Sequence, residues 1–515
     1  MALKTGNPAG KILHNSFWYG LETVFEMVAF FGTSIAVARY LGPAKLGYFS
    51  YINLFVTIIT RTSGTGLSTA TRKYMSEFIA LERLGTARAV YNLAHRYQFI
   101  AASSITILGV AGIVLFGDPH FRLVSVILIL SIIPGLMSWV PAQANLAFED
   151  MSKNAQSAFG YIIVYATVIG LTLYFKWDLV GVAAASLVGR TVEVFLRTIP
   201  LNRFLRTLPL DPLDGEIIRR IRRFCVQAVG LQILMSVIWD RSEMFFLRAF
   251  SSLEQMAFYS VSFTFANNNL MMFPRILGGS TGVTLMVEAT RDPDRVASIV
   301  QNSCRYLLLI MLPVCLGAAA VAFPAVHVVY GKRYAGAVPV LIIAAILVIP
   351  RAFQSIPELL LRTADLQNRI LVWYTVTGVI NIVLDYFLIR HYGAIGAAWA
   401  NGIAQCFGVI AIWEVARRVY IFRFPIQACI RLSAAAAIMA AMAYSIDRAI
   451  PGLPGLVLAI TTAIPVYLVL VKLFRGLAFS DRVRLAPIGN RFPAPARKLY
   501  LAAIDLITPR TQEEF

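Results

Sequence analysis

The sequence predicts an all-α polytopic membrane protein with about fourteen transmembrane helices, arranged as two pseudo-symmetric six-helix lobes plus two extra C-terminal helices. Hydrophobic residues make up 58% of the 515 residues and charged residues only 14%. A soluble globular chain has roughly 25% charged residues. Apolar stretches of about twenty residues, each long enough to cross a bilayer as a helix, recur along the chain. The third observation is an internal repeat that relates the two halves.

The apolar stretches define the expected membrane spans. Their number is even, which places both termini on the same side of the membrane, and misassignment of two adjacent spans would reduce it to twelve. We predict spans at residues 15–37, 48–70, 91–116, 121–147, 156–175, 179–200, 224–247, 256–286, 303–330, 335–361, 370–389, 393–414, 431–449 and 454–474.

The distribution of basic residues predicts the orientation. Of the 46 Lys and Arg residues, we assign 32 to loops, tails and span ends on the side of the termini, ten to the opposite side and four to the interior of spans (Arg61, Arg190, Arg275 and Arg351). Cytoplasmic loops carry the excess of Lys and Arg, so we expect cytoplasmic termini. The same bias explains most of the net charge of +19. The basic face is expected against anionic lipid headgroups, and no nucleic-acid partner is needed to explain it.

The repeat predicts the domain organisation. Pro134 and Pro141 recur as Pro350 and Pro357, and residues 181–185 (GVAAA) recur as 396–400 (GAAWA), all shifted by 215 or 216 positions. Six helices per copy give the two copies the same orientation in the membrane. The expected domains are an N-lobe at 1–205, a polar cytoplasmic connector at 206–223, a C-lobe at 224–414, two further spans at 415–474 and a basic cytoplasmic tail at 475–515.

Two arginines lie inside apolar spans at matching places of the repeat. Arg61 and Arg275 are 214 positions apart. A guanidinium at mid-bilayer costs at least ~2.5–3.5 kcal/mol. Retaining two of them indicates a positively charged cavity between the lobes. The alternative is structural, with Arg61 paired to Glu22 or Glu26.

Polar side chains accompany both arginines at helical spacing, and we include them with Arg351 as candidate substrate-binding residues. Guanidinium groups bind phosphate oxygens, and amides and hydroxyls bind sugar hydroxyls, so the set suits a sugar phosphate. The polar candidates are Thr57 and Thr65 near Arg61, and Asn267, Asn268 and Asn269 near Arg275.

Four carboxylates in apolar spans are candidates for coupling to an ion gradient. Glu22 and Glu26 share a helix face, and two close carboxylates in a low dielectric rarely both stay ionised. Glu358 either binds an ion or neutralises Arg351. Asp385 is either a proton or cation site or an interfacial residue. Arg190, three residues from Glu193, is interpreted mainly as a local ion pair.

Signatures of enzymes are weak. No P-loop motif occurs, and the G-x-S-x-G match at residues 278–282 lies in a membrane span without a preceding strand. The five histidines form no metal-binding pattern. The short loops opposite the termini disfavour a polytopic glycosyltransferase. We therefore expect a transporter without a cofactor or metal, coupled if at all to an H⁺ or Na⁺ gradient.

Two local motifs resemble one transporter family. Residues 38–43 (ARYLGP), followed by 47–50 (GYFS), resemble the first external loop of bacterial polysaccharide transporters, the oligosaccharide flippases of the Wzx type. Residues 66–74 (GLSTATRKY) are similar to the end of that family's second span. The family belongs to the MATE-like MOP superfamily, which also holds lipid II flippases and multidrug/cation antiporters.

The resemblance implies a flippase of the bacterial cytoplasmic (inner) membrane. Such a protein moves undecaprenyl-pyrophosphate-linked oligosaccharide to the outer leaflet by alternating access, for surface or exopolysaccharide synthesis. The implied partners are the lipid-linked glycan, membrane lipids, and the polysaccharide polymerase and chain-length machinery. A multidrug or cation antiporter and a lipid II flippase are the alternatives within the superfamily. Which glycan is carried is not specified by the sequence.

Overall fold

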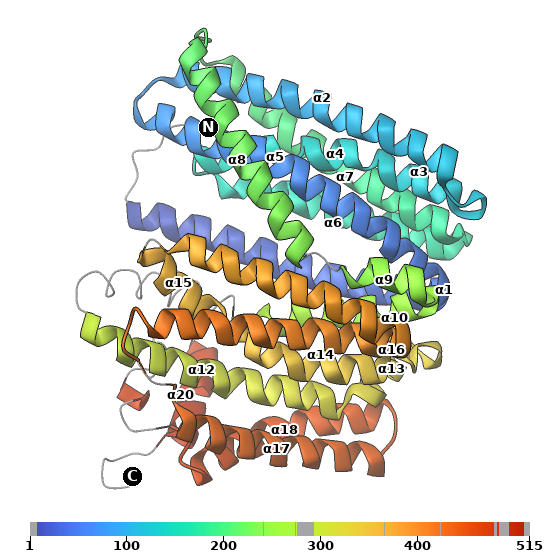
Figure 1. The fold of residues 1–515 in the computed structure, drawn as a ribbon, viewed down its shortest axis with the longest axis vertical. Coiled ribbons are helices and arrows are strands. Elements are labelled where there is room, and N and C mark those ends of the chain that lie inside the picture. The colour runs from blue at the N-terminus through green and yellow to red at the C-terminus, as the bar shows by residue number, and fades with distance from the viewer. Residues whose placement is uncertain are drawn as a thin grey trace. The chain divides into compact units, whose positions relative to one another are not determined.

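The computed structural model describes residues 8–239, 242–272, 274, 293–364, 366–422, 424–477, 481–483 and 494–508. In these residues the chain forms helices and no strands (Figure 1). Nine of the described helices are long and apolar enough to cross a membrane. The predicted all-α polytopic fold is confirmed, whereas the count of fourteen spans stays a prediction. The chain divides into two compact units, unit 1 at Met1–Phe245 and unit 2 at Phe246–Phe515.

Unit 1 is a helical bundle in which neighbouring helices are joined by short turns. Its elements are α1 (Pro8–Ala80), α2 (Leu84–Phe116), the 3₁₀ turn η1 (Pro119–Phe121), α3 (Arg122–Leu130), α4 (Ile132–Met137), α5 (Trp139–Ala147), α6 (Met151–Phe175), α7 (Asp178–Arg206) and α8 (Gly215–Trp239).

Helix α1 contains the first two expected spans, which meet at Gly42. Gly42 has φ 72° and ψ 174°, and Pro43 follows it. Glycine adopts this conformation without a steric penalty, and proline is well placed at the start of the next helix because it has no N–H to satisfy there. The prediction of an external loop at 38–50 is therefore wrong, because these residues are helical apart from this single bend.

The span expected at 121–147 is broken into α3, α4 and α5. The breaks fall at Ser131 and Ser138. Pro134 and Pro141 each lie three residues after a break and supply no N–H for the helical ladder, which explains why the helix is discontinuous there. Both serines are buried.

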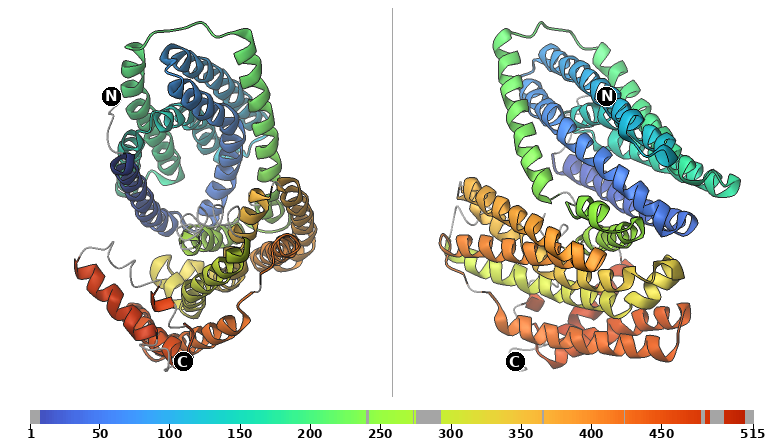
Figure 2. Two further views of the ribbon diagram at one scale, coloured as in Figure 1. Left: turned by 90° about the vertical axis from the view of Figure 1, so that its left-hand side faces the viewer. Right: turned by 45° about the vertical axis from the view of Figure 1, so that its right-hand side comes forward.

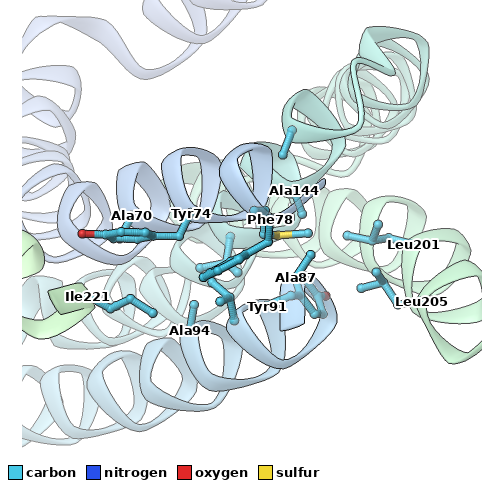
Figure 3. Close-up of a cluster of buried hydrophobic side chains, with 14 residues drawn as sticks. Ala70, Tyr74, Phe78, Ala87, Tyr91, Ala94, Ala144, Leu201, Leu205 and Ile221 are labelled. Carbon is cyan, nitrogen blue, oxygen red and sulfur yellow. The ribbon is translucent and has the colours of Figure 1, made fainter. Parts of the chain in front are cut away.

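The N- and C-terminal ends of several unit 1 helices share one apolar core. Tyr74 and Phe78 of α1 pack with Tyr91 of α2 and with Leu201 and Leu205 of α7 (Figure 3). Ile221 of α8 joins the same cluster, so α8 packs with unit 1.

Polar contacts attach the connector to this end of unit 1. Arg220 forms a two-pronged ion pair with Glu77, with N–O distances of 2.8 and 3.1 Å, and Thr86 donates to Asp211 at 3.2 Å. Tyr74 donates to the Arg220 carbonyl at 3.3 Å. Burial raises the pKa of Tyr74.

Unit 2 is a second helical bundle. Its elements are α9 (Glu243–Phe250, which crosses the unit boundary), α10 (Leu253–Thr264), the π-helical turn η2 (Phe265–Leu270), α12 (Pro293–Ala320), α13 (Ala322–Val329), the 3₁₀ turn η3 (Lys332–Tyr334), α14 (Ala337–Ala352), α15 (Ser355–Thr363), α16 (Gln367–Arg417), α17 (Ile426–Ala449), α18 (Leu453–Leu473) and α20 (Ala494–Ile507).

Helix α16 holds two expected spans, 370–389 and 393–414, on either side of Gly393. This glycine has φ 55° and ψ −129°. The position 215 residues earlier is Asp178, which has φ 56° and begins α7. The pair α6 and α7 thus corresponds to the two parts of α16, and α14 with α15 repeats the broken span α3–α5.

The C-terminal segment is part of unit 2. Helices α17 and α18 lie side by side and are joined by a short turn (Figure 2), and α20 packs against α18. Asp481 is fully buried and accepts from Arg305 at 2.5 Å and from Tyr306 at 3.0 Å. Ile504 and Ile507 of α20 are also buried.

Candidate substrate-binding surfaces

A polar stripe runs along the uncovered face of α1. Asn53, Arg61, Thr69 and Ser76 are exposed, and Thr57 and Thr65 between them are half-buried. Residues three to four apart share a helix face. These positions therefore form one line centred on Arg61, which we call the α1 stripe.

The remaining surface of α1 packs closely against its own unit, and two glycines permit this. A Cβ on Gly64 would lie 2.9 Å from the Trp139 ring of α5. A Cβ on Gly66 would lie 2.6 Å from Val229 and 3.1 Å from the Cys225 carbonyl oxygen of α8. The packing of α1 thus fixes its rotation and keeps the α1 stripe away from the interior of unit 1.

The threonine hydroxyls of the α1 stripe donate to their own helix. Thr57 donates to the Asn53 carbonyl at 2.8 Å, and Thr65 donates to the Arg61 carbonyl at 2.6 Å. Such bonds fix the hydroxyl proton and leave the oxygen lone pairs as acceptors. The stripe therefore presents guanidinium donors beside hydroxyl acceptors, which suits a phosphate joined to a sugar.

In unit 2 the structure joins two of the predicted residues. Arg351 of α14 donates through Nη1 to Oδ1 of Asn267, and Asn267 Nδ2 donates to the Phe263 carbonyl at 3.1 Å. Asn267 lies on η2, a π-helical turn, a feature often found at functional sites. Asn269 is half-buried on the same turn. The side chain of Asn268, and Arg275 as a whole, lie outside the described residues.

Glu358 of α15 belongs to a hydrogen-bond network that includes Tyr374 of α16, which its spacing in the sequence could not predict. Gln354 donates to Glu358 at 2.9 Å and to the Tyr374 hydroxyl of α16 at 2.6 Å. Arg362 pairs with Glu358 at 3.6 Å. Arg351 and Glu358 thus each have other close partners. Tyr374 comes from a different span, so the sequence contained no spacing signal for it.

Asp385 of α16 is fully buried in unit 2. Asn381, one turn earlier on the same helix, donates to its Oδ2 at 3.1 Å. The carboxylate is thus enclosed by the helices of unit 2. The side chains of the other two carboxylate candidates, Glu22 and Glu26, lie outside the described residues.

Sequence reasoning missed most of a buried ionic network in unit 1. Glu193 pairs with Arg190 at 2.9 Å, as expected, but also with Arg197 at 3.1 Å. Ser138, at the break between α4 and α5, donates to Glu193 at 3.2 Å and accepts from Arg197 at 2.6 Å. The four-residue spacing of Glu193 and Arg197 could have predicted their ion pair. We did not consider it because Arg197 lies at the end of an expected span.

The fold is that of a multi-pass membrane protein with several long apolar helices. The chain belongs to the polysaccharide biosynthesis protein family, whose sequence profile matches residues 36–339. The resemblance noted in the sequence is therefore confirmed. Comparison with curated protein sequences finds no match.

Solved structures of several transporters share the fold. The inward closed conformation of the lipid II flippase MurJ superposes with a TM-score of 0.69 at 16% identity, covering 88% of this chain and 98% of MurJ. An inward-facing multidrug resistance MATE family transporter of the MOP superfamily gives a TM-score of 0.62 at 16% identity, covering 76% and 94%.

A third similar structure is a MOP superfamily transporter from Pyrococcus furiosus, described as having a binding pocket of reverse polarity. It gives a TM-score of 0.56 at 14% identity, covering 81% of this chain and 97% of that one. At these identities the three likenesses establish the MOP-type fold alone.

Proposed function

We propose that the protein is a flippase that translocates undecaprenyl-pyrophosphate-linked oligosaccharide repeat units across the bacterial cytoplasmic membrane by alternating access, for surface or exopolysaccharide synthesis. Membership in the polysaccharide biosynthesis family and the MOP-type fold support this proposal. The single observation that carries the proposed substrate is the α1 stripe, with the exposed Arg61 at its centre.

The physical argument concerns where an exposed guanidinium can lie in a membrane protein. Charged residues within spans face polar surroundings, because contact with acyl chains costs several kcal/mol. The rotation of α1 keeps Arg61 out of the interior of unit 1, so the α1 stripe is an exposed polar surface that an anionic headgroup can bind. A pyrophosphate headgroup needs polar partners during transport, because moving it through lipid without them costs a prohibitive amount of free energy.

Unit 2 contains a second set of polar side chains that we include in the proposed binding site. Arg351 bonded to Asn267 presents a guanidinium and an amide on elements that the repeat relates to unit 1. Arg275, Asn268 and Asn269 extend this set by sequence. Coupling to a proton or sodium gradient is part of the proposal, with Glu22, Glu26, Glu358 and Asp385 as the candidate carboxylates. The proposed orientation has both termini in the cytoplasm.

One observation favours a second candidate, a cation antiporter like the MATE transporters. The buried Asp385 is a carboxylate in the apolar interior of unit 2, the kind of group that binds a proton or cation. A lipid II flippase is the third possibility within the fold. These candidates differ in their substrates, so a direct transport assay separates them.

The decisive experiment measures flipping by the purified protein in vesicles. Wild-type protein and the variants Arg61→Glu, Arg275→Glu and the double variant are reconstituted with fluorescent undecaprenyl-pyrophosphate-linked oligosaccharide. Each charge reversal is expected to slow flipping about tenfold or more, since one charge-assisted hydrogen bond contributes roughly 1.5–3 kcal/mol. Arg122→Glu, at an exposed arginine that begins α3, is the matched control.

Three outcomes would contradict the proposal. The first is wild-type flipping by the double Glu variant at normal protein levels. The second is transport of lipid II in place of the oligosaccharide lipid, which would assign the lipid II alternative. The third is export of a cationic dye, lost in Asp385→Asn, without any lipid flipping, which would assign the antiporter.

A further inference from the structure

Unit 1 has a second exposed guanidinium at membrane depth, on a different helix from the α1 stripe. Arg190 lies twelve residues after the start of α7, which places it roughly 18 Å along the helix. Helix α7 is one of the candidate membrane spans. The Arg190 side chain is 41% exposed. Arg190 is ion-paired with Glu193, and part of its side chain stays accessible to a ligand beside that pair.

Aromatic rings from two other helices form a cluster on one side of this arginine. The Arg190 guanidinium lies 4.5 Å from the ring centre of Tyr161 of α6. Tyr161 and Tyr165, one turn apart, stack at 5.7 Å between ring centres with 25° between their planes. Phe30 of α1 lies 6.0 Å from Tyr161 and 6.1 Å from Tyr165. We call Phe30, Tyr161, Tyr165 and Arg190 the aromatic platform.

A layer of buried groups holds the platform in place. Glu193 fixes Arg190, and Arg197 with Ser138 fixes Glu193. Gly189 lets the rings lie against α7, because a Cβ there would come within 2.9 Å of Tyr161. A first layer supported in this way by a second is the arrangement expected of a binding site whose geometry must be kept.

The members of the platform divide into a covered part and an accessible part. Tyr161 is buried beneath Arg190, whereas Phe30 is exposed and Tyr165 is half-buried. The accessible surface therefore consists of aromatic carbon beside guanidinium donors. It differs from the aromatic residues at the far end of α6, Tyr174 and Phe175, whose place at the end of a span is typical of membrane interfaces.

The chemistry of this surface matches a sugar ring. One face of a pyranose presents C–H groups, which the electron-rich face of an aromatic ring attracts, and its rim presents hydroxyls that a guanidinium can hydrogen-bond. We infer that the aromatic platform binds a sugar ring of the transported glycan, through stacking on Tyr165 and Phe30 and hydrogen bonds from Arg190. This inference rests on the proposed function, because it assigns a place to the saccharide part of that substrate.

The test compares two ligands that differ only in the sugar. Dissociation constants of the full-length protein in detergent are measured for undecaprenyl pyrophosphate and for the same lipid carrying one N-acetylglucosamine. In the wild-type protein the sugar should tighten binding about tenfold, the value of one aromatic contact with an added hydrogen bond. Tyr165→Leu and Arg190→Gln should reduce this ratio to about one, with unchanged affinity for undecaprenyl pyrophosphate.

The experiment includes one control and one further test variant. Tyr174→Leu removes an exposed tyrosine from the same helix and should retain the full tenfold ratio. Phe30→Leu changes an exposed residue and serves if Arg190→Gln fails to fold, with an expected partial loss of the ratio.

The possible failures are distinguishable. A wild-type ratio of one, or an undiminished ratio in both platform variants, overturns the platform but leaves the proposed function intact if both lipids bind. If neither lipid binds to the wild-type protein, the proposed function is overturned as well.

Discussion

Tyr40 and Gln255 are 215 positions apart in the sequence and have the same role in the two units. Tyr40 accepts a hydrogen bond from the backbone N–H of Asp178 at 3.2 Å, where α7 begins. Gln255 accepts from the N–H of Ala394 at 3.0 Å, directly after the bend of α16 at Gly393. Each side chain thus satisfies an N–H at a helix start that would otherwise have no helical partner. The repeat therefore extends to individual hydrogen bonds although the residue types differ.

The two helix-start bonds should differ in their contribution to stability. Ala394 is fully buried, so Gln255→Leu strands an N–H away from water and should cost about 1–3 kcal/mol. Asp178 is half-exposed, so water can replace Tyr40 in Tyr40→Phe and the cost should be smaller. Thermal denaturation of the purified variants measures both, with Tyr97→Phe at an exposed tyrosine as control. A larger effect of Tyr40→Phe than of Gln255→Leu would contradict this ordering.

Substitutions in the buried ionic network of unit 1 should lower stability more when they leave more charged groups without a partner. Glu193→Leu leaves both Arg190 and Arg197 without their shared carboxylate, and removal of one partner from a buried pair costs about 3–5 kcal/mol. Arg197→Leu leaves Glu193 still paired with Arg190 and should cost less. Folded yield and thermal stability report both effects. Equal stability of the two variants would show that Arg190 does not support Glu193.

Two glycines of α1 provide a matched pair for testing how closely α1 packs against α8. A Cβ at Gly66 meets Val229 and the Cys225 backbone, so Gly66→Ala should destabilise unit 1 by about 1–3 kcal/mol. A Cβ at Gly32 meets nothing within 4 Å, so Gly32→Ala should be neutral or slightly stabilising through helix propensity. Thermal denaturation compares them. Loss of stability in both would mean that helix packing is not the cause.

The hydrogen bond between Arg351 and Asn267 is expected to couple α14 with η2. A double-mutant cycle with Arg351→Gln and Asn267→Leu should give a coupling energy of about 1.5–3 kcal/mol in stability, as for hydrogen bonds to charged groups. Flipping rates of the same four proteins show whether substrate binding needs the pair. Additive stability effects would indicate that the two side chains act independently.

The sequence predicted those features whose signal lies within one span or one repeat. A lone arginine in an apolar stretch identified Arg61, and recurring motifs identified the duplication. The bond between Ser138 and Glu193 could not be predicted, because Ser138 comes from a helix break more than fifty residues away. Tyr374 escaped prediction for the same reason. The bend at Gly42 was taken for a loop, because Gly-Pro commonly ends a helix and the sequence does not show that the next one begins at once.

The buried Asp481 has a practical consequence for handling this protein. A chain shortened to residue 480 would leave Arg305 and Tyr306 without the carboxylate that both contact, in the middle of unit 2. Truncation at the end of α18, the obvious place to attach a fluorescent folding reporter, would therefore give a poorly expressed protein irrespective of transport. A reporter attached beyond Thr508 retains that carboxylate and α20.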